Sequence, residues 1–344
     1  MYTTRFFAIG LTVIACASLT GNAVSNGAPD TMAMHPSTDA TPSADSPAAE
    51  LLATGLQGAS GSAIGPDGAL YVTEGAVGRI SRIDPRTGAV TTFASGLPPA
   101  VVGIGGAIDV AFIGRTAYAL VTLVGADVMG DPRDTVGIYR VDKDNTFTVV
   151  ADLGTFSKNH PPDMPIDVPS GLQYALEPYR GGFLVTDGHH NRVLFATVHN
   201  RVNEVIAFDN VVPTGLAASG SLVFVAQAGP VPHRPEDGKV VVFHPRWPFA
   251  VEIASGARLL VDVEFGPDRT LYALSQGALP EDAPPATPAL PHTGALVKVD
   301  WDGGFTEVAP ELNQPTSLEF IGNTAYVVTL GGEVWKLNLR RHSR

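Results

Sequence analysis

The sequence predicts an all-β fold, a six-bladed β-propeller with four antiparallel strands in each blade. One hairpin pattern (an apolar run, a tight Gly/Asp/Asn turn and a second apolar run) recurs along the chain. Its anchor side chains, from Tyr71 to Tyr326, recur about every 51 residues, a period typical of propeller blades. The chain of 344 residues contains 37 Gly and 28 Pro but only 16% charged residues, which indicates turn-dense sheets rather than a helical bundle or a coiled coil.

The first two strands of each blade come from this hairpin. It is clearest at residues 64–72 (IGPDGALYV) and recurs at 265–273 (FGPDRTLYA). Four weaker copies begin at Phe112, Gly182, Ser221 and Phe320. Each is a β-hairpin by its alternation and by the residue types in its turn.

An alternating segment after each hairpin supplies the third strand, and a short turn leads to a fourth. The sixth unit ends after its third strand, at residues 332–337. Residues 51–56 precede the first hairpin and resemble the segments that follow other fourth strands, so we expect them to complete the last blade as its outer strand. Such closure hides sheet edges that would otherwise pair with other chains. Residues 51–340 are therefore expected to form one domain.

The first 16 residues are expected to be an export signal. Arg5 supplies the positive charge, and residues 6–15 form an apolar run that is too short to span a bilayer. Cys16 follows Val-Ile-Ala, a pattern that resembles the bacterial lipobox, in which the cysteine becomes the lipidated N-terminus. The alternative is an ordinary signal peptide, cleaved after Ala17 or Ala23.

Residues 17–50 are expected to be a disordered tether. Sixteen of the 25 residues in 26–50 are Ala, Pro, Ser or Thr, a composition that cannot bury enough apolar surface to fold. A tether behind a signal suits an exported protein of the cell envelope or periplasm, lipid-anchored at Cys16 or otherwise secreted.

The charge balance limits the partners. The formal net charge is −12, from 22 Lys and Arg against 34 Asp and Glu. Such a chain is poorly suited to bind nucleic acid or an anionic membrane surface. We therefore expect membrane contact only through a lipid anchor, and a monomer. Cys16 is the one cysteine, so no intrachain disulfide can form.

The long insertions are all expected on one face of the ring. Each lies between the second and third strands of a blade or between consecutive blades, and in a propeller both connections are at the same end. They are residues 98–107, 122–136, 154–170, 227–237 and 276–293. Loops on a rigid scaffold commonly carry binding sites. This face is therefore the expected binding surface for a small molecule or a protein partner.

Polar residues at the ends of strands are expected around the channel mouth on that face. The candidate ligand-binding residues are Glu74, Asp109, Asp187, Gln227, Asp262 and Thr316. Ser62, Ser170 and Thr214 belong to the same set of inner-strand positions. Asp109 and Asp262 are the strongest candidates because their contexts, IDVAF and VDVEF, are equivalent. Their oxygens could hold Ca²⁺ or a polar ligand, or could simply solvate the channel.

No catalytic residue is identified. The chain lacks the G-x-S-x-G, Walker and H-E-x-x-H patterns. His189 and His190 follow Asp187, and this group could bind a metal or transfer protons. The alternative is an exposed turn whose adjacent histidine side chains point apart.

The ordered set of blade motifs resembles the ScyD/ScyE family, secreted six-bladed propellers of bacteria. The motifs include IGPDGALYVTEG (64–75), FLVTDGHHNRVL (183–194), VEFGPDRTLYAL (263–274) and QPTSLEF (314–320). The resemblance covers about residues 51–337, and the 227–237 and 276–293 loops depart from it. It implies a secreted propeller, but no settled activity and no catalytic residue.

Two functions follow from these observations. The first is a non-catalytic ligand- or protein-binding module of the cell envelope. The alternative is a divalent-metal-dependent hydrolase similar to the gluconolactonase and regucalcin propellers. Its channel metal would be held by Glu74, Asp109, Asp187 and Asp262, although no asparagine is evident at the channel mouth.

Overall fold

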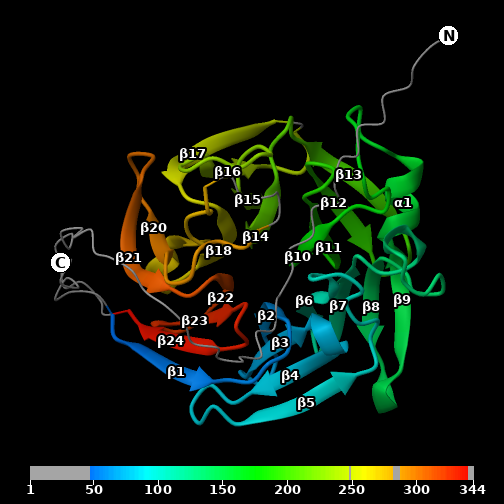
Figure 1. Cartoon of the computed structure of the whole chain (residues 1–344), viewed down its shortest axis with the longest axis horizontal. Coiled ribbons are helices and arrows are strands. Elements are labelled where there is room, and N and C mark those ends of the chain that lie inside the picture. Colours follow the sequence, from blue (N-terminus) through cyan, green and yellow to red (C-terminus); the bar gives the residue numbers. More distant parts are fainter. Residues whose placement is uncertain (1–46, 248, 282–286, 340–344) are drawn as a thin grey trace, which may run out of the picture.

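The computed structural model describes residues 47–247, 249–281 and 287–339. They form six four-stranded antiparallel sheets arranged around a central axis (Figure 1). The predicted six-bladed β-propeller is confirmed.

The bounds of the strands follow the predicted repeat, and the strands of each blade succeed one another from the axis outward. Blade 1 contains β2 (Ala59–Ile64), β3 (Leu70–Glu74), β4 (Arg79–Ile83) and β5 (Val90–Ser95). Blade 2 contains β6 (Gly106–Ile113), β7 (Thr116–Thr122), β8 (Gly137–Val141) and β9 (Phe147–Asp152). Blade 3 contains β10 (Gln173–Tyr179), β11 (Gly182–Asp187), β12 (Arg192–Thr197) and β13 (Val202–Ala207).

The second half of the ring repeats this order. Blade 4 contains β14 (Pro213–Ser219), β15 (Leu222–Gln227), β16 (Gly238–Phe243) and β17 (Ala250–Ala257). Blade 5 contains β18 (Leu260–Phe265), β19 (Leu271–Ser275), β20 (Gly294–Val299) and β21 (Phe305–Leu312). Blade 6 contains β22 (Pro315–Ile321), β23 (Thr324–Thr329), β24 (Val334–Asn338) and β1 (Ala49–Ala53).

The ring closes through the N-terminal strand, as expected. β1 lies along β24 at the outer edge of blade 6, where Ala49 pairs with Leu337 and Leu51 with Trp335 (Figure 1). The strand begins at Ala49, two residues before the predicted start, and ends at Ala53, three residues before the predicted end. The register shifts between Leu51 and Ala53, as at a β-bulge, and Ala53 still pairs with Val334.

The apolar core is divided among the interfaces between blades. Buried side chains form one cluster at each of the six interfaces, including the closing interface between blades 6 and 1. Phe183, Leu120 and Ile138, for example, are fully buried between blades 2 and 3. Because each sheet packs apolar side chains on both faces, few positions in the strands remain for charged residues.

Threonine hydroxyls join neighbouring blades near the axis. Thr186 Oγ1 donates to the Thr214 carbonyl oxygen at 2.6 Å, and Thr316 Oγ1 donates to the Ser60 carbonyl oxygen at 2.9 Å. Thr73 and Thr214 make equivalent bonds to the next blade. These bonds satisfy buried carbonyl groups and fix the spacing of the inner strands.

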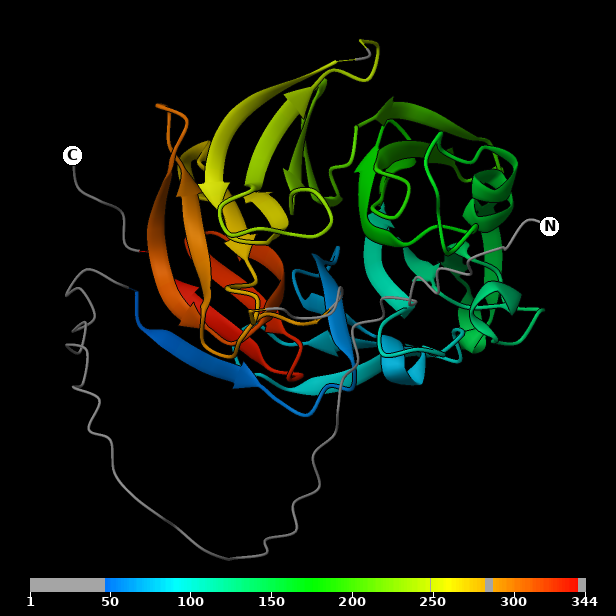
Figure 2. The same ribbon diagram turned by 45° about the horizontal axis from the view of Figure 1, so that its top comes forward.

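The insertion between blades 2 and 3 contains helix α1 (Leu153–Asn159), which the sequence pattern indicated only as a loop (Figure 2). Asp152 caps it, accepting the Thr155 amide at 2.8 Å. The remaining helical turns are 3₁₀ segments at Gly75–Val77, Ala126–Val128, Lys143–Asn145 and Pro267–Arg269.

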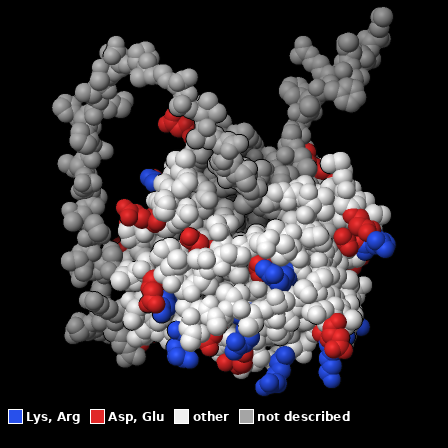
Figure 3. All heavy atoms as spheres, turned by 60° about the horizontal axis from the view of Figure 1, so that its bottom comes forward, with Lys and Arg blue, Asp and Glu red and all other residues white. Residues whose placement is uncertain are grey.

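None of the helices within the described ranges has the length and apolar character needed to cross a membrane. The charged side chains visible in Figure 3 are scattered over the outer surface, with acidic and basic groups interspersed.

Candidate functional site

A cavity of about 1210 Å³ lies along the propeller axis. The inner strands of all six blades line it, and so does every one of the five long insertions, through residues such as Ile104, Val128, Val168, His233 and Leu279. The face that the insertions were expected to share is therefore the face on which the cavity opens.

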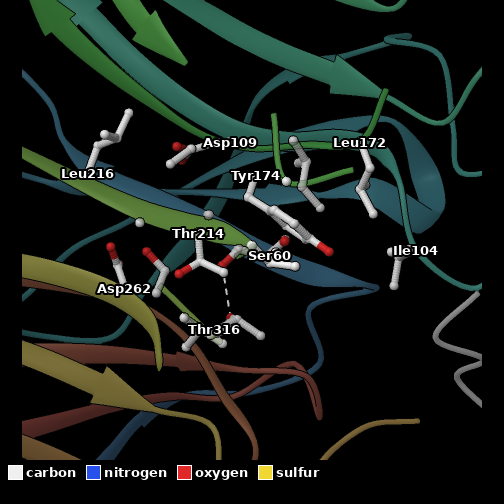
Figure 4. Close-up of a pocket in the computed structure, with 18 of the residues that line it drawn as sticks. Ser60, Ile104, Asp109, Leu172, Tyr174, Thr214, Leu216, Asp262 and Thr316 are labelled. Atoms are coloured by element: carbon white, nitrogen blue, oxygen red, sulfur yellow. Dashed lines mark hydrogen bonds between the residues drawn. The ribbon is translucent and has the colours of Figure 1, made fainter. Parts of the chain in front are cut away.

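The part of the cavity near the insertions is mainly apolar. Ile104, Leu123 and Val128 come from the insertions on the blade 2 side, and Leu172 and Val212 come from the connections into blades 3 and 4. Figure 4 shows Ile104 and Leu172 on one side of the close-up, and Asp109 and Asp262 on the other. Deeper polar groups therefore lie behind an apolar entrance.

Asp109 and Asp262 occupy equivalent positions in blades 2 and 5, as their sequence contexts predicted. Asp109 accepts the amides of Val110 (2.8 Å) and Leu176 (2.7 Å), the second from blade 3. Asp262 accepts the amides of Val263 and Leu318, both at 2.8 Å, the second from blade 6. Each aspartate thus links its own inner strand to that of the next blade.

Burial raises the pKa of both aspartates. The pKa of Asp262 rises to about 7. Burial also holds the pKa of Asp109 well above its usual range, although two backbone amides favour its charged form. Burial therefore favours the protonated form of both carboxyl groups.

Three glutamates form a second level of carboxyl groups in the cavity. Each lies on an inner strand directly opposite the anchor side chain of its hairpin: Glu177 opposite Leu184, Glu264 opposite Tyr272, Glu319 opposite Tyr326. In the other three blades the same position holds Ala63, Ala111 and Ala217. We call Glu177, Glu264 and Glu319 the glutamate ring.

Burial raises the pKa of every member of the glutamate ring. The pKa of Glu177 rises to about 8, and that of Glu264 also rises to about 8 because the Glu177 charge adds to its burial. The pKa of Glu319 lies well above its usual range, through burial and through the charge of Glu264. No Lys or Arg is among the described residues that line the cavity, so no fixed cation balances these acids.

The glutamate ring was not among the residues that the sequence singled out. The signal was present, because each glutamate stands seven or eight residues before its hairpin anchor, as the three alanines do. Aligning the blades on the anchors places all six positions at one level of the channel.

Glu74 does not line the cavity. It is fully buried in blade 1, where Arg79 Nη2 lies 2.6 Å from its Oε2, and it also accepts the Gln57 amide at 2.8 Å. Burial would raise the Glu74 pKa, but hydrogen bonds from Arg79 and Ser81 hold it below the usual value. Its ion pair makes it a structural residue.

Asp187 also lies outside the cavity lining, within a buried charged network beside helix α1. Arg192, 2% exposed, donates to Asp187 Oδ2 at 3.2 Å, to Ser157 Oγ at 3.0 Å and to the His160 carbonyl oxygen at 2.7 Å. Burial would raise the Asp187 pKa, but the His190 hydrogen bond and the Arg192 charge hold it below its usual value. We call Asp187, His190, Arg192 and Ser157 the blade 3 network.

The two adjacent histidines do not form the expected exposed turn. His190 is 2% exposed, and its Nδ1 lies 3.1 Å from Asp187 Oδ2. His189 lines the cavity, and its Nε2 accepts the amides of Asp167 and Val168, both at 3.1 Å. Burial lowers the pKa of His189, which favours this acceptor form.

The remaining candidate residues also divide into those that line the cavity and those that do not. Thr316, Ser62 and Thr214 line the cavity, and Thr316 is committed to backbone carbonyls. Gln227 and Ser170 are buried but outside the lining, and neither Gln227 Oε1 nor Ser170 Oγ has a hydrogen-bond partner among the described residues. Cys16 lies outside the described residues.

The residues that were expected to hold a channel metal do not fit one. Glu74 and Asp187 are ion-paired elsewhere, and Asp109 and Asp262 are held by backbone amides. Asn210 does line the mouth, contrary to expectation, but its side chain bonds the Val231 backbone. Within the described ranges no group of three or more His, Cys, Asp or Glu is placed to hold a metal ion.

The comparisons with known proteins show the fold. No family profile and no curated protein matches the sequence. Among similar solved structures are a gluconolactonase from Xanthomonas campestris (14% identity, 85% of this chain and 89% of that chain, TM-score 0.57) and a PQQ-bound aldose sugar dehydrogenase from Streptomyces coelicolor (14%, 86% and 98%, 0.58). A virginiamycin B lyase from Staphylococcus aureus is also similar (14%, 85% and 99%, 0.52). At these identities the likeness concerns the β-propeller architecture alone.

Proposed function

We propose that this propeller is an exported, non-catalytic binding module of the cell envelope that takes a small molecule into its central cavity. One observation carries the proposal: every long insertion contributes to the lining of a single cavity of about 1210 Å³. An apolar entrance with a few polar groups behind it is typical of small-molecule sites. The resemblance of the blade motifs to secreted ScyD/ScyE propellers supports the same interpretation.

The rival proposal is the metal-dependent hydrolase. Its support is the shared fold, because a gluconolactonase and a sugar dehydrogenase are among the similar structures. The residues favour the binding module, because the four carboxylates proposed as metal ligands are held by arginines or backbone amides. Fold alone does not determine function.

Binding of the neutral apolar dye Nile red tests the cavity. We expect its fluorescence to rise with the folded protein and the rise to be lost in V212W, which narrows the entrance. V149W is the matched control, because Val149 is 39% exposed on the outer strand β9. Equal dye binding by both variants would contradict entry through this face.

Thermal unfolding with and without millimolar Ca²⁺ tests the rival. A ligand that binds the folded state raises the melting temperature with its concentration. We expect no rise with Ca²⁺ and no hydrolysis of an aldonolactone. A rise that D262N abolishes, together with lactone hydrolysis, would establish the metal hydrolase instead.

The proposed anchor is tested at Cys16. C16S should move the protein from the membrane fraction to the soluble fraction or leave its signal unprocessed. Unchanged membrane association would rule out lipidation.

A further inference from the structure

We propose that the cavity selects organic cations: molecules with an apolar body and an ammonium group, which is held at the glutamate ring. This rests on the proposed function, because it concerns the ligand of the same cavity.

The glutamate ring has free acceptor capacity that faces the cavity. Glu177 Oε1 accepts the Ala218 amide at 3.1 Å, and Glu264 Oε1 accepts the amide of its own neighbour, Phe265, at 2.8 Å. Within the described part of the chain, the Glu319 carboxyl group has no hydrogen bond, although it lies deep in the channel and is surrounded by protein. Its partial exposure is to the cavity itself. A carboxyl group without a partner in such a place leaves hydrogen-bonding capacity for a ligand.

The positions of the glutamates leave room for a ligand. The level they share also contains Ala63, Ala111 and Ala217, so three of the six inner strands carry no long side chain there, and Ala63 and Ala111 line the cavity. Thr316 near the mouth and Glu319 are three residues apart on β22, roughly 10 Å along a strand. An ammonium group at the ring would therefore leave an apolar body several carbons long within the apolar entrance.

The charge of the lining selects among ligand classes. An anion would find no Lys or Arg to pair with among the described lining residues, and each carboxyl group that is ionised would repel it. A polyol would leave the apolar entrance unmatched. A compact divalent ion requires several oxygens around one point, and the described residues offer no such group. An ammonium group donates up to three hydrogen bonds, and the ring presents three separate carboxyl groups.

Binding of an ammonium group should expel protons. Burial raises the pKa of each ring carboxyl group and so favours its protonated form. A cation that enters the cavity favours their ionised form, so protons leave to solvent and binding tightens as pH rises. The titratable groups that line the cavity are Asp109, Asp167, Tyr174, Glu177, His189, His233, Asp262, Glu264 and Glu319. An alkylammonium stays charged throughout, since its pKa is close to that of lysine, about 10.4.

Calorimetric titration with three ligands of equal length tests the selection: n-octylammonium, 1-octanol and octanoate. We expect octylammonium to bind roughly ten- to a hundredfold more tightly than octanol, the range for a hydrogen bond to a charged group. Octanoate should bind most weakly. Equal binding of octylammonium and octanol would overturn this inference and leave the proposed function standing. Failure of both to bind would overturn both proposals.

Glutamine variants test whether the glutamate ring causes the preference for octylammonium. E264Q/E319Q should lose the preference for octylammonium and retain octanol binding, which also shows that the variant is folded. E307Q is the matched control, because Glu307 is exposed on β21, away from the cavity. An unchanged preference in E264Q/E319Q would overturn the assignment to the glutamate ring.

Proton release gives an independent readout. Titration of octylammonium at pH 7 in two buffers of different ionisation enthalpy should give different observed enthalpies, and the difference should shrink in E264Q/E319Q. Equal enthalpies in both buffers would show that the ring does not release protons and would contradict the inference.

Discussion

Carboxyl groups shielded from bulk water occur in two parts of this propeller, and their surroundings differ. In the blade 3 network, Asp187 lies 3.2 Å from the Arg192 guanidinium and 3.1 Å from His190, and its pKa falls below the usual value. On the axis, Asp262 and Glu264 are half-buried and line the cavity without a basic partner in the described lining, and their pKa values rise to about 7 and about 8.

The difference separates a structural role from a binding role. In the blade 3 network the arginine joins Asp187 to Ser157 of helix α1, so the charges connect two elements. On the axis the carboxyl groups have no basic partner in the described lining, so they are available to a ligand that enters the cavity. Carboxyl groups that line a cavity and have strongly shifted pKa values are a recognised sign of a functional site.

The largest effect is expected from breaking the blade 3 network. R192M leaves Asp187 buried without its cation, which should lower the free energy of unfolding by about 3–5 kcal/mol. Urea denaturation measures this. R192M/D187N removes the stranded charge and should recover part of the loss. If the double variant is no more stable than the single one, the cost does not come from the unpaired carboxylate.

A change of pH should change the free energy of unfolding in opposite directions through the two regions. The pKa values of the axial carboxyls are higher in the folded chain than in the unfolded chain, so the stability linked to their protonation is complete below about pH 4.5 and is lost as pH rises through about 8. We expect the free energy of unfolding to fall between pH 5 and pH 9 in urea titrations. E264Q/E319Q should reduce this fall.

Asp187 acts in the opposite direction. Its folded-state pKa is lowered, so its contribution is present above its unfolded pKa and is lost on acidification through the folded value. Stability that rises steadily from pH 5 to pH 9 would contradict the description of the axial carboxyls.

Intermediate effects are expected at the two equivalent aspartates. D109A and D262A each leave the amide of the next blade's inner strand unbonded, which should cost about 1–3 kcal/mol. Thermal or urea unfolding of the two variants should give similar losses. A large difference between the two losses would show that the aspartates of blades 2 and 5 do not contribute equally to stability.

The smallest effect is expected at an exposed ion pair. Arg133 Nη2 lies 2.5 Å from Asp131 Oδ2, but the Arg133 side chain is 88% exposed. Exposed pairs contribute little because water screens them. R133A should leave the unfolding midpoint unchanged within error, and a clear loss would show that exposure does not explain the contrast with Arg192.

The sequence predicted the fold because the repeat was visible in it. The hairpin motif and its spacing determine six blades, and the missing strand of the sixth unit predicted closure by residues near 51. The bounds of β1 were less predictable, because β1 owes its strand conformation to pairing with β24, far away in the sequence.

The site was only partly predictable. Asp109 and Asp262 were found because their contexts match, and both line the cavity. Glu74 and Asp187 were misplaced because strand ends suggested the mouth, whereas Arg79 and Arg192 hold them in the blade interior. Sequence position indicates which end of a strand a residue occupies, but not which cation reaches it.

The closing strand has a consequence for the time at which the ring can form. Among the described strands, β1 comes first in the chain and pairs with β24, which comes last. Until β24 is in place, β1 has no partner in its sheet and blade 6 is incomplete. Folding dominated by such distant pairing is slow. A chain truncated before Val334 would retain five complete sheets but no closed ring, and its first strand would be free to pair with another molecule.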